Sequence, residues 1–154
     1  MRNFSQWAGL ALGVALADQI SKRWIMDWMG SDPIRRINPY FDLVLAYNQG
    51  AAFSFLANAN GWQRYFFSFI ALAALLFMGI LIHRHPENRR FCLGLSLIMG
   101  GALGNLIDRA LVGTVTDFIQ WHVGSHYWPA FNLADSAITI GVAILLWDGL
   151  KTSK

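Results

Sequence analysis

Four apolar stretches determine what this chain can fold into. They cover approximately residues 7–26, 63–82, 91–111 and 131–150. A helix of about 20 residues is needed to cross the roughly 30 Å of hydrocarbon in a bilayer. Charged residues make up only 14% of the chain, whereas soluble domains carry about 25%. The sequence therefore predicts a membrane α-helical protein, a single domain over residues 1–154, with four transmembrane helices and two extramembrane segments, 27–62 and 112–130, on one face.

Positive charge orients the predicted spans. The short loop RHPENRR, residues 84–90, carries three arginines and lies on the same predicted face as both termini. Because cytoplasmic loops are enriched in Lys and Arg, we expect both termini in the cytoplasm and the two long segments outside. Ala15-Leu16-Ala17 resembles a secretory cleavage site, but apolar residues continue to Met26, so we expect the first helix to be retained. An aromatic belt is expected near the outer face, from Trp24, Trp28, Trp62, Trp121 and Trp128.

Charge and cysteine content exclude several kinds of site. The formal charge of +3 comes from scattered basic residues, so no nucleic-acid partner is expected. Cys92 is the only cysteine, which excludes any site that needs two. His122 and His126 have metal-ligand spacing, but Gly124 weakens a helix between them and no H-E-x-x-H motif is present, so we expect no metal and no cofactor.

Polar residues inside the apolar stretches are functional candidates, because burying charge in lipid is costly. Asp18 and Lys22 are four residues apart on one helical face, which fits either a neutralised structural pair or a site for a polar headgroup. Gly100 and Gly104 have the spacing that lets two helices approach closely. At the end of the same stretch, Asp108 and Arg109 have the position of interfacial charge, whereas Asn105 needs another explanation.

Asp117 and Asp135 lie next to the third and fourth stretches and reach the same membrane face. Thr114-x-x-Asp117 and Asn132-x-x-Asp135 both resemble capping boxes, in which the carboxylate receives backbone N–H groups at a helix start. Capping explains either aspartate alone. Taken together, the two aspartates also fit a catalytic pair.

Two neighbouring carboxylates cannot both ionise easily, so they share one proton. One then acts as a base on water while the other donates a hydrogen bond to a carbonyl, which hydrolyses a peptide bond without metal or nucleophilic side chain. The helix dipole at the start of the fourth stretch favours negative charge on Asp135, so we expect Asp117 to hold the proton.

The outer segment contains a further element before the second stretch. DLVLAY, residues 42–47, has the composition of a short strand, and residues 48–50 have that of a turn. A strand edge there is suited to pairing with an extended peptide, and an ordinary folded loop is the alternative.

Five motifs, in order along the chain, resemble those of the lipoprotein signal peptidase (signal peptidase II) family. They are DQISK (18–22), NQGAAF (48–53), GGALGNLIDR (100–109), VTDF (115–118) and FNLADSAI (131–138). The resemblance implies an aspartic endopeptidase of the bacterial inner membrane that cuts prolipoproteins just before a diacylglyceryl-modified cysteine. It implies four transmembrane helices, a small extracytoplasmic sheet called the β-cradle, a short periplasmic helix, and inhibition by globomycin.

The resemblance also assigns roles to residues of this chain. It places catalysis on Asp117 and Asp135. Contact with substrate or lipid, or support of this pair, is implied for Asp18, Lys22, Asn48, Gly50, Gly101, Asn105, Arg109 and Asn132. Small residues such as Gly101 and Ala102 are expected to leave an apolar path for lipid between helices. The expected partners are prolipoprotein substrates and membrane phospholipid, the expected state is a monomer, and the active site is expected near the periplasmic face.

Two functions of other classes fit parts of the pattern. A small proton-coupled transporter subunit would use Asp18, Asp108 and Asp135 as relay carboxylates, but transporters place such groups near the midplane and show repeated halves. A structural membrane adaptor would not need two aspartates on one face.

Overall fold

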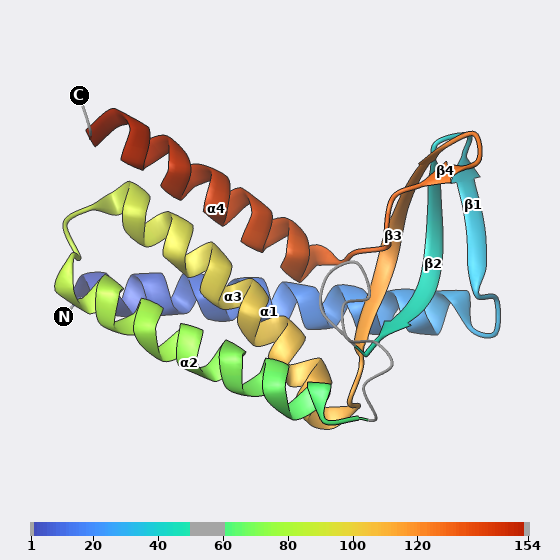
Figure 1. Cartoon of the computed structure of the whole chain (residues 1–154), viewed down its shortest axis with the longest axis horizontal. Coiled ribbons are helices and arrows are strands. Elements are labelled where there is room, and N and C mark those ends of the chain that lie inside the picture. The colour runs from blue at the N-terminus through green and yellow to red at the C-terminus, as the bar shows by residue number, and fades with distance from the viewer. Residues whose placement is uncertain (1, 50–60, 153–154) are drawn as a thin grey trace.

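A bundle of long helices with a small sheet at one end makes up the computed structural model, which describes residues 2–49 and 61–152. The helices are α1 (Arg2–Met29), α2 (Gln63–Arg84), α3 (Arg89–Leu111) and α4 (Leu133–Thr152). The strands are β1 (Ile34–Asn38), β2 (Phe41–Asn48), β3 (Val115–Val123) and β4 (His126–Tyr127). The start of α1 and the end of α4 lie together at the end of the bundle opposite the sheet (Figure 1).

Three of the described helices are long and apolar enough to cross a membrane: Gln63–Arg84, Arg89–Leu111 and Leu133–Lys151. They coincide with the second, third and fourth predicted stretches, so the prediction of a helical membrane protein is confirmed. α1 is longer than any of them at 28 residues. It is not among the three, because its sequence combines apolar residues with Asp18, Lys22, Arg23 and Asp27.

Helix α3 lies between the other helices and packs on them through glycines. A Cβ on Gly100 would overlap the Ala11 carbonyl oxygen and the Val14 side chain of α1. A Cβ on Gly104 would overlap the Asp18 carboxylate of the same helix. The close approach predicted for Gly100 and Gly104 is therefore confirmed, with α1 as the partner helix.

Gly101 faces a different neighbour. A Cβ there would overlap the backbone oxygen of Ala134 and the side chain of Ile138, both on α4. The apolar lipid path predicted beside Gly101 is therefore wrong, because α4 fills that space. Gly101 instead allows the start of α4 to pack directly against α3.

The sheet is antiparallel throughout, in the order β1-β2-β3-β4. β2 contains the strand predicted at residues 42–47. Phe118 of β3 forms a buried cluster with Ile25 and Met29 at the end of α1, which anchors the sheet to the bundle. Every helix among residues 2–49 and 61–152 belongs to the bundle, so the predicted short periplasmic helix is not found in the described part of the chain.

The packing of Gly101 predicts the effect of adding one methyl group. Gly101→Ala forces α3 and α4 apart, because the obstructing atom is backbone, and we expect it to lower the free energy of unfolding by about 1–3 kcal/mol. Gly13→Ala is the matched control, since a Cβ on Gly13 meets nothing within 4 Å. Thermal unfolding of the two purified variants in detergent measures the difference. Equal melting temperatures for both variants would contradict this packing.

Candidate active site

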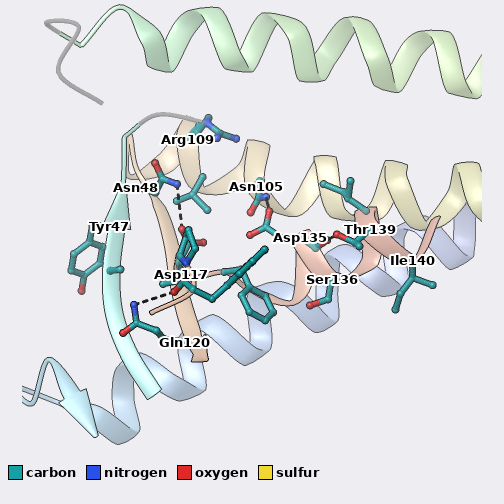
Figure 2. A pocket seen from close by; sticks show the side chains of 17 residues that line it. Tyr47, Asn48, Asn105, Arg109, Asp117, Gln120, Asp135, Ser136, Thr139 and Ile140 are labelled. Carbon is teal, nitrogen blue, oxygen red and sulfur yellow. Dashed lines mark hydrogen bonds between the residues drawn. The ribbon is translucent and has the colours of Figure 1, made fainter. Parts of the chain in front are cut away.

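A cavity of about 930 Å³ opens between the sheet and the ends of α3 and α4 that face it. Figure 2 shows side chains from four elements pointing into it: Asn48 from β2, Asp117 from β3, Asn105 from α3 and Asp135 from α4. The cavity continues along α4 past Ser136 to Ile140. Both aspartates predicted to form the catalytic pair therefore line one cavity.

Asp135 is held by the start of α4. Its backbone N–H donates to Asn132 Oδ1 at 2.9 Å, and its Oδ2 accepts from the Asn132 backbone N–H at 3.2 Å. These reciprocal bonds are the capping box predicted for Asn132 and Asp135. The remaining oxygen, Oδ1, accepts from Asn105 Nδ2 at 2.9 Å. The cap therefore fixes the carboxylate in the cavity wall, with donors on both oxygens.

Asp117 is held differently. The capping box predicted for Thr114 and Asp117 is wrong, because Asp117 lies inside strand β3 and not at a helix start. Its Oδ1 accepts from Asn132 Nδ2 at 2.8 Å, and its Oδ2 lies 3.4 Å from Asn48 Nδ2, a long hydrogen bond. Threonine followed by aspartate three positions later marks a helix start only when a helix follows, and here β-branched Val115 and Thr116 begin a strand.

The surroundings of Asp117 favour its neutral form. Burial raises the pKa of its carboxyl group from the ordinary 3.8 to about 7, and the negative charge of Asp135 contributes in the same direction. Hydrogen bonds from Asn48 and Asn132 and the positive charge of Lys22 act to lower this pKa and do not offset the effect of burial.

Asn132 connects the two carboxylates. It is completely buried, and its side-chain N–H groups face Asp117 Oδ1 at 2.8 Å, Asn105 Oδ1 at 3.1 Å and the Thr116 carbonyl at 3.3 Å. Its side-chain oxygen accepts from the Asp135 backbone. One asparagine therefore sets the positions of both aspartates.

A buried ionic network supports this arrangement from the side of α1. Lys22 Nζ lies 2.8 Å from Asp18 Oδ2, which confirms the predicted pair, and also 2.8 Å from Asp108 Oδ2. Its third contact is Asn105 Oδ1 at 3.0 Å. Asp18 Oδ1 accepts from the backbone N–H of Ala134 at 2.9 Å, at the start of α4. The pair therefore connects α1 to α3 and α4 and does not face lipid.

Two members of the network were missed by sequence reasoning. Asp108, predicted to be interfacial charge, is buried and accepts from the Thr116 backbone at 3.1 Å and from Gln19 Nε2 at 2.8 Å. The spacing of Gly101, Gly104 and Asp108 places all three on nearly the same side of α3, and that periodicity was the available signal. Gln19 follows Asp18 directly and carries no comparable signal.

The other predicted site residues have different positions. Arg109 lines the cavity, with its guanidinium 5.4 Å from the centre of the Phe67 ring. Gly101 instead packs against Ala134 and Ile138 of α4. Gly50 lies outside the described residues. His122 is buried, with Nε2 3.4 Å from Asp42 Oδ1 in a geometry that makes no hydrogen bond. Within residues 2–49 and 61–152, no group of three His, Cys, Asp or Glu side chains is arranged to hold a metal ion.

Comparison with known proteins decides the family. The family model described as Signal peptidase (SPase) II matches residues 10–151. The chain belongs to the signal peptidase II family. Lipoprotein signal peptidase of Paraburkholderia phymatum is 50% identical over 149 residues, covering 97% of this chain and 90% of that protein. The protein of the same name from Burkholderia thailandensis is 48% identical over 145 residues, covering 94% of this chain and 87% of that protein.

Two solved bacterial membrane enzymes have the same fold as this signal peptidase II. One has a TM-score of 0.80 at 30% identity and covers 97% of this chain and 90% of its own. The other has a TM-score of 0.77 at 31% identity and covers 96% of this chain and 94% of its own. The family predicted from the five motifs is therefore confirmed, and this chain is a membrane peptidase. The alternative of a proton-coupled transporter is excluded by this assignment.

The raised pKa of Asp117 predicts how stability depends on pH. Below about pH 4 the carboxyl group is protonated both folded and unfolded, so its burial costs little. Between about pH 4 and pH 7 the group is ionised in the unfolded chain but still protonated in the folded protein, so the free energy of unfolding falls as the pH rises and becomes constant above about pH 7. A pKa change from 3.8 to about 7 corresponds to at most about 4 kcal/mol.

Asp117→Asn removes this titration. We expect the variant to match the parent below about pH 4 and to be the more stable protein above about pH 7. Thermal unfolding of both proteins across this range measures the difference. A stability difference that is the same at every pH would contradict the raised pKa.

Proposed function

We propose that this signal peptidase II removes signal peptides from prolipoproteins, cutting just before the diacylglyceryl-modified cysteine, with Asp117 and Asp135 as a catalytic pair that shares one proton. The observation that carries the proposal is the position of both carboxylates in the wall of one cavity, each bonded to Asn132. The names of the relatives from Paraburkholderia and Burkholderia support the substrate class.

The hydrogen bonds and the burial of the two carboxylates support a different role for each aspartate. Asp135 accepts a donor on each oxygen and sits at the positive end of the α4 dipole, so it is the ionised member. Asp117 is the protonated member, because burial and the charge of Asp135 raise its pKa to about 7. A water molecule between the two carboxylates and the scissile carbonyl has a base on one side, and the carbonyl has a proton donor on the other.

The proposed reaction uses one water molecule and these two carboxyl groups. Asp135 takes a proton from water as the water oxygen bonds to the carbonyl carbon, and Asp117 donates its proton to the carbonyl oxygen. In the second step the C–N bond breaks. The leaving nitrogen takes the proton from Asp135, and Asp117 regains its proton from the hydroxyl group of the intermediate. The pair ends as it began, with one proton.

The shape of the cavity suits a substrate that is both peptide and lipid. On one side it is lined by strands β2 and β3, and on the other it continues along α4 past Ile138 as far as Ile140. The hydroxyl groups of Ser136 and Thr139 donate to the backbone carbonyls of Asn132 and Asp135, at 3.0 and 2.8 Å. Their polarity is therefore satisfied internally, and this part of the cavity suits acyl chains.

The side chains of α1 support a fourth transmembrane span. Asp18 and Lys22 face inward and pair with each other, whereas the outward stripe is apolar. This stripe consists of Leu12, Leu16, Ile20 and Trp24. A helix exposed to water would present polar residues there. At about 1.5 Å per residue, 28 residues are also long enough to cross the hydrocarbon.

With four spans and both termini in the cytoplasm, the sheet and the aspartate pair would lie at the periplasmic face of the bacterial inner membrane, and this is the topology that we propose. The exposed tryptophans Trp24, Trp28, Trp62, Trp121 and Trp128 support a membrane boundary at this level. We propose that the protein acts as a monomer without a cofactor, with prolipoprotein substrate and membrane phospholipid as its partners.

The aspartate pair predicts a sharp mutational pattern. Asp117→Asn and Asp135→Asn are each expected to reduce cleavage of a diacylglyceryl prolipoprotein peptide by about a thousandfold or more, because each removes the base or the shared proton. Asp32→Asn is the matched control, since Asp32 is a solvent-exposed aspartate whose Oδ2 lies 3.4 Å from Arg35 Nη2. Product analysis with the purified protein in detergent measures the rates.

Two further observations make this test specific. A metal chelator should leave the rate unchanged, and globomycin should inhibit the parent. A parental cleavage rate in either aspartate variant would contradict the proposed mechanism. Loss of activity with the chelator would indicate metal-assisted hydrolysis.

The fourth span has its own test. A reporter that is active only in the periplasm should be inactive when fused before α1, between α2 and α3, or after α4. It should be active when inserted at Gly124, in the hairpin between β3 and β4. A periplasmic signal from the fusion before α1, with the other three unchanged, would mean that α1 does not cross the membrane.

A further inference from the structure

Lys22 is the one group of the ionic network that donates to Asn105, and Asn105 donates to Asp135. An ammonium group carries three N–H donors and no acceptor. All three are used here, on Asp18 at 2.8 Å, on Asp108 at 2.8 Å and on Asn105 Oδ1 at 3.0 Å. Its side chain is only 3% exposed, so water does not compete for these bonds.

The side-chain amide of Asn105 has two possible orientations, and they have opposite effects on Asp135. In the observed orientation the oxygen faces Lys22 and the N–H groups face Asp135 Oδ1, at 2.9 Å. In the reversed orientation the oxygen would face the carboxylate. An N–H donor stabilises the ionised carboxylate, whereas a facing oxygen stabilises the protonated acid.

Asn132 and Lys22 both donate to Asn105 Oδ1, and the bond from Lys22 is the shorter of the two and is the one that carries a charge. The Asn132 side chain has two N–H hydrogens for three acceptors: Asp117 Oδ1 at 2.8 Å, Asn105 Oδ1 at 3.1 Å and the Thr116 carbonyl at 3.3 Å. Thr116 therefore competes with Asn105 for the second hydrogen, and loss of Lys22 would leave this shared bond as the remaining donor to Asn105 Oδ1. With Lys22, the reversed amide would place donor against donor.

We propose that Lys22 is a positioning residue that selects Asp135 as the ionised member of the catalytic pair, because it fixes the orientation of the Asn105 amide. This inference rests on the proposed function of Asp117 and Asp135. It assigns Lys22 an effect on the protonation of a residue that it does not contact. Its role therefore goes beyond neutralising Asp18 and Asp108.

The charges around the pair must be kept constant in a test. They come from Asp18 and Lys22 on α1, Asp108 and Arg109 on α3, and the two aspartates themselves. Lys22→Met combined with Asp108→Asn removes one positive and one negative charge, so the formal charge of the network is unchanged while the donor to Asn105 is lost. Lys22→Met with Asp18→Asn is a second variant of the same design, available if the first does not fold.

The measurement is the dependence of prolipoprotein-peptide cleavage on pH, with folding checked by circular dichroism. We expect the acidic limb of the profile to move to higher pH by about one unit, since one charge-assisted hydrogen bond to the ionised carboxylate is lost. Asn105→Leu should move the limb by a similar amount with Lys22 in place. Adding Asn105→Leu to the charge-matched variant should produce no further movement, because both changes remove the same bond.

The outcomes separate this inference from the proposed function. If Asp117→Asn or Asp135→Asn still cleaves, the proposed catalytic pair is wrong. If both are inactive and a folded charge-matched variant keeps the parental acidic limb, only the role of Lys22 is overturned. Additive movement in the combined variant would also overturn it, since Lys22 would then act directly through space.

Discussion

The structure depends on one constraint: a polar group buried in an apolar bundle must find its hydrogen-bond partners within the protein. Asn132 satisfies this constraint with partners on three elements, because its side chain contacts Asn105 of α3, Asp117 of β3 and the backbone at the start of α4. Asp18 adds α1 through the Ala134 backbone. These few bonds fix the register between the bundle and the sheet, and they can form only when all four elements are in place.

The same constraint produces the chemistry. Water would hydrate the Asp117 carboxylate and keep its pKa near 3.8, but burial raises this pKa to about 7. The Asp135 carboxylate accepts two hydrogen bonds, one on each oxygen. The Asp117 carboxylate accepts one short and one long hydrogen bond. Two identical side chains therefore have different hydrogen-bond surroundings. Because of the raised pKa of Asp117, the free energy of unfolding falls as the pH rises, and the positive charge of Lys22 in the ionic network offsets part of that loss.

Local patterns in the sequence predicted the local parts of this site. The Asn132–Asp135 cap and the Asp18–Lys22 pair each join residues three or four positions apart, so their spacing is sufficient to identify them. Thr114-x-x-Asp117 has the spacing of a cap, but the following residues form a strand, and the pattern alone does not distinguish these cases. Asp108 was misjudged because its partners Gln19 and Lys22 are more than 80 positions away in the chain.

Helix α1 shows why mean hydropathy does not identify every helix that has an apolar outer side. Hydropathy averages all sides of a helix, whereas a lipid-facing helix needs only its outer side to be apolar. In α1 the outer stripe through Leu16 and Ile20 is apolar, and the charges of Asp18 and Lys22 cancel on the inner side. The low average hydropathy of α1 therefore reflects the polar network that joins it to α3 and α4 beside the proposed catalytic pair. The residues that weaken the span signal of α1 are the ones that give the helix its role in the site.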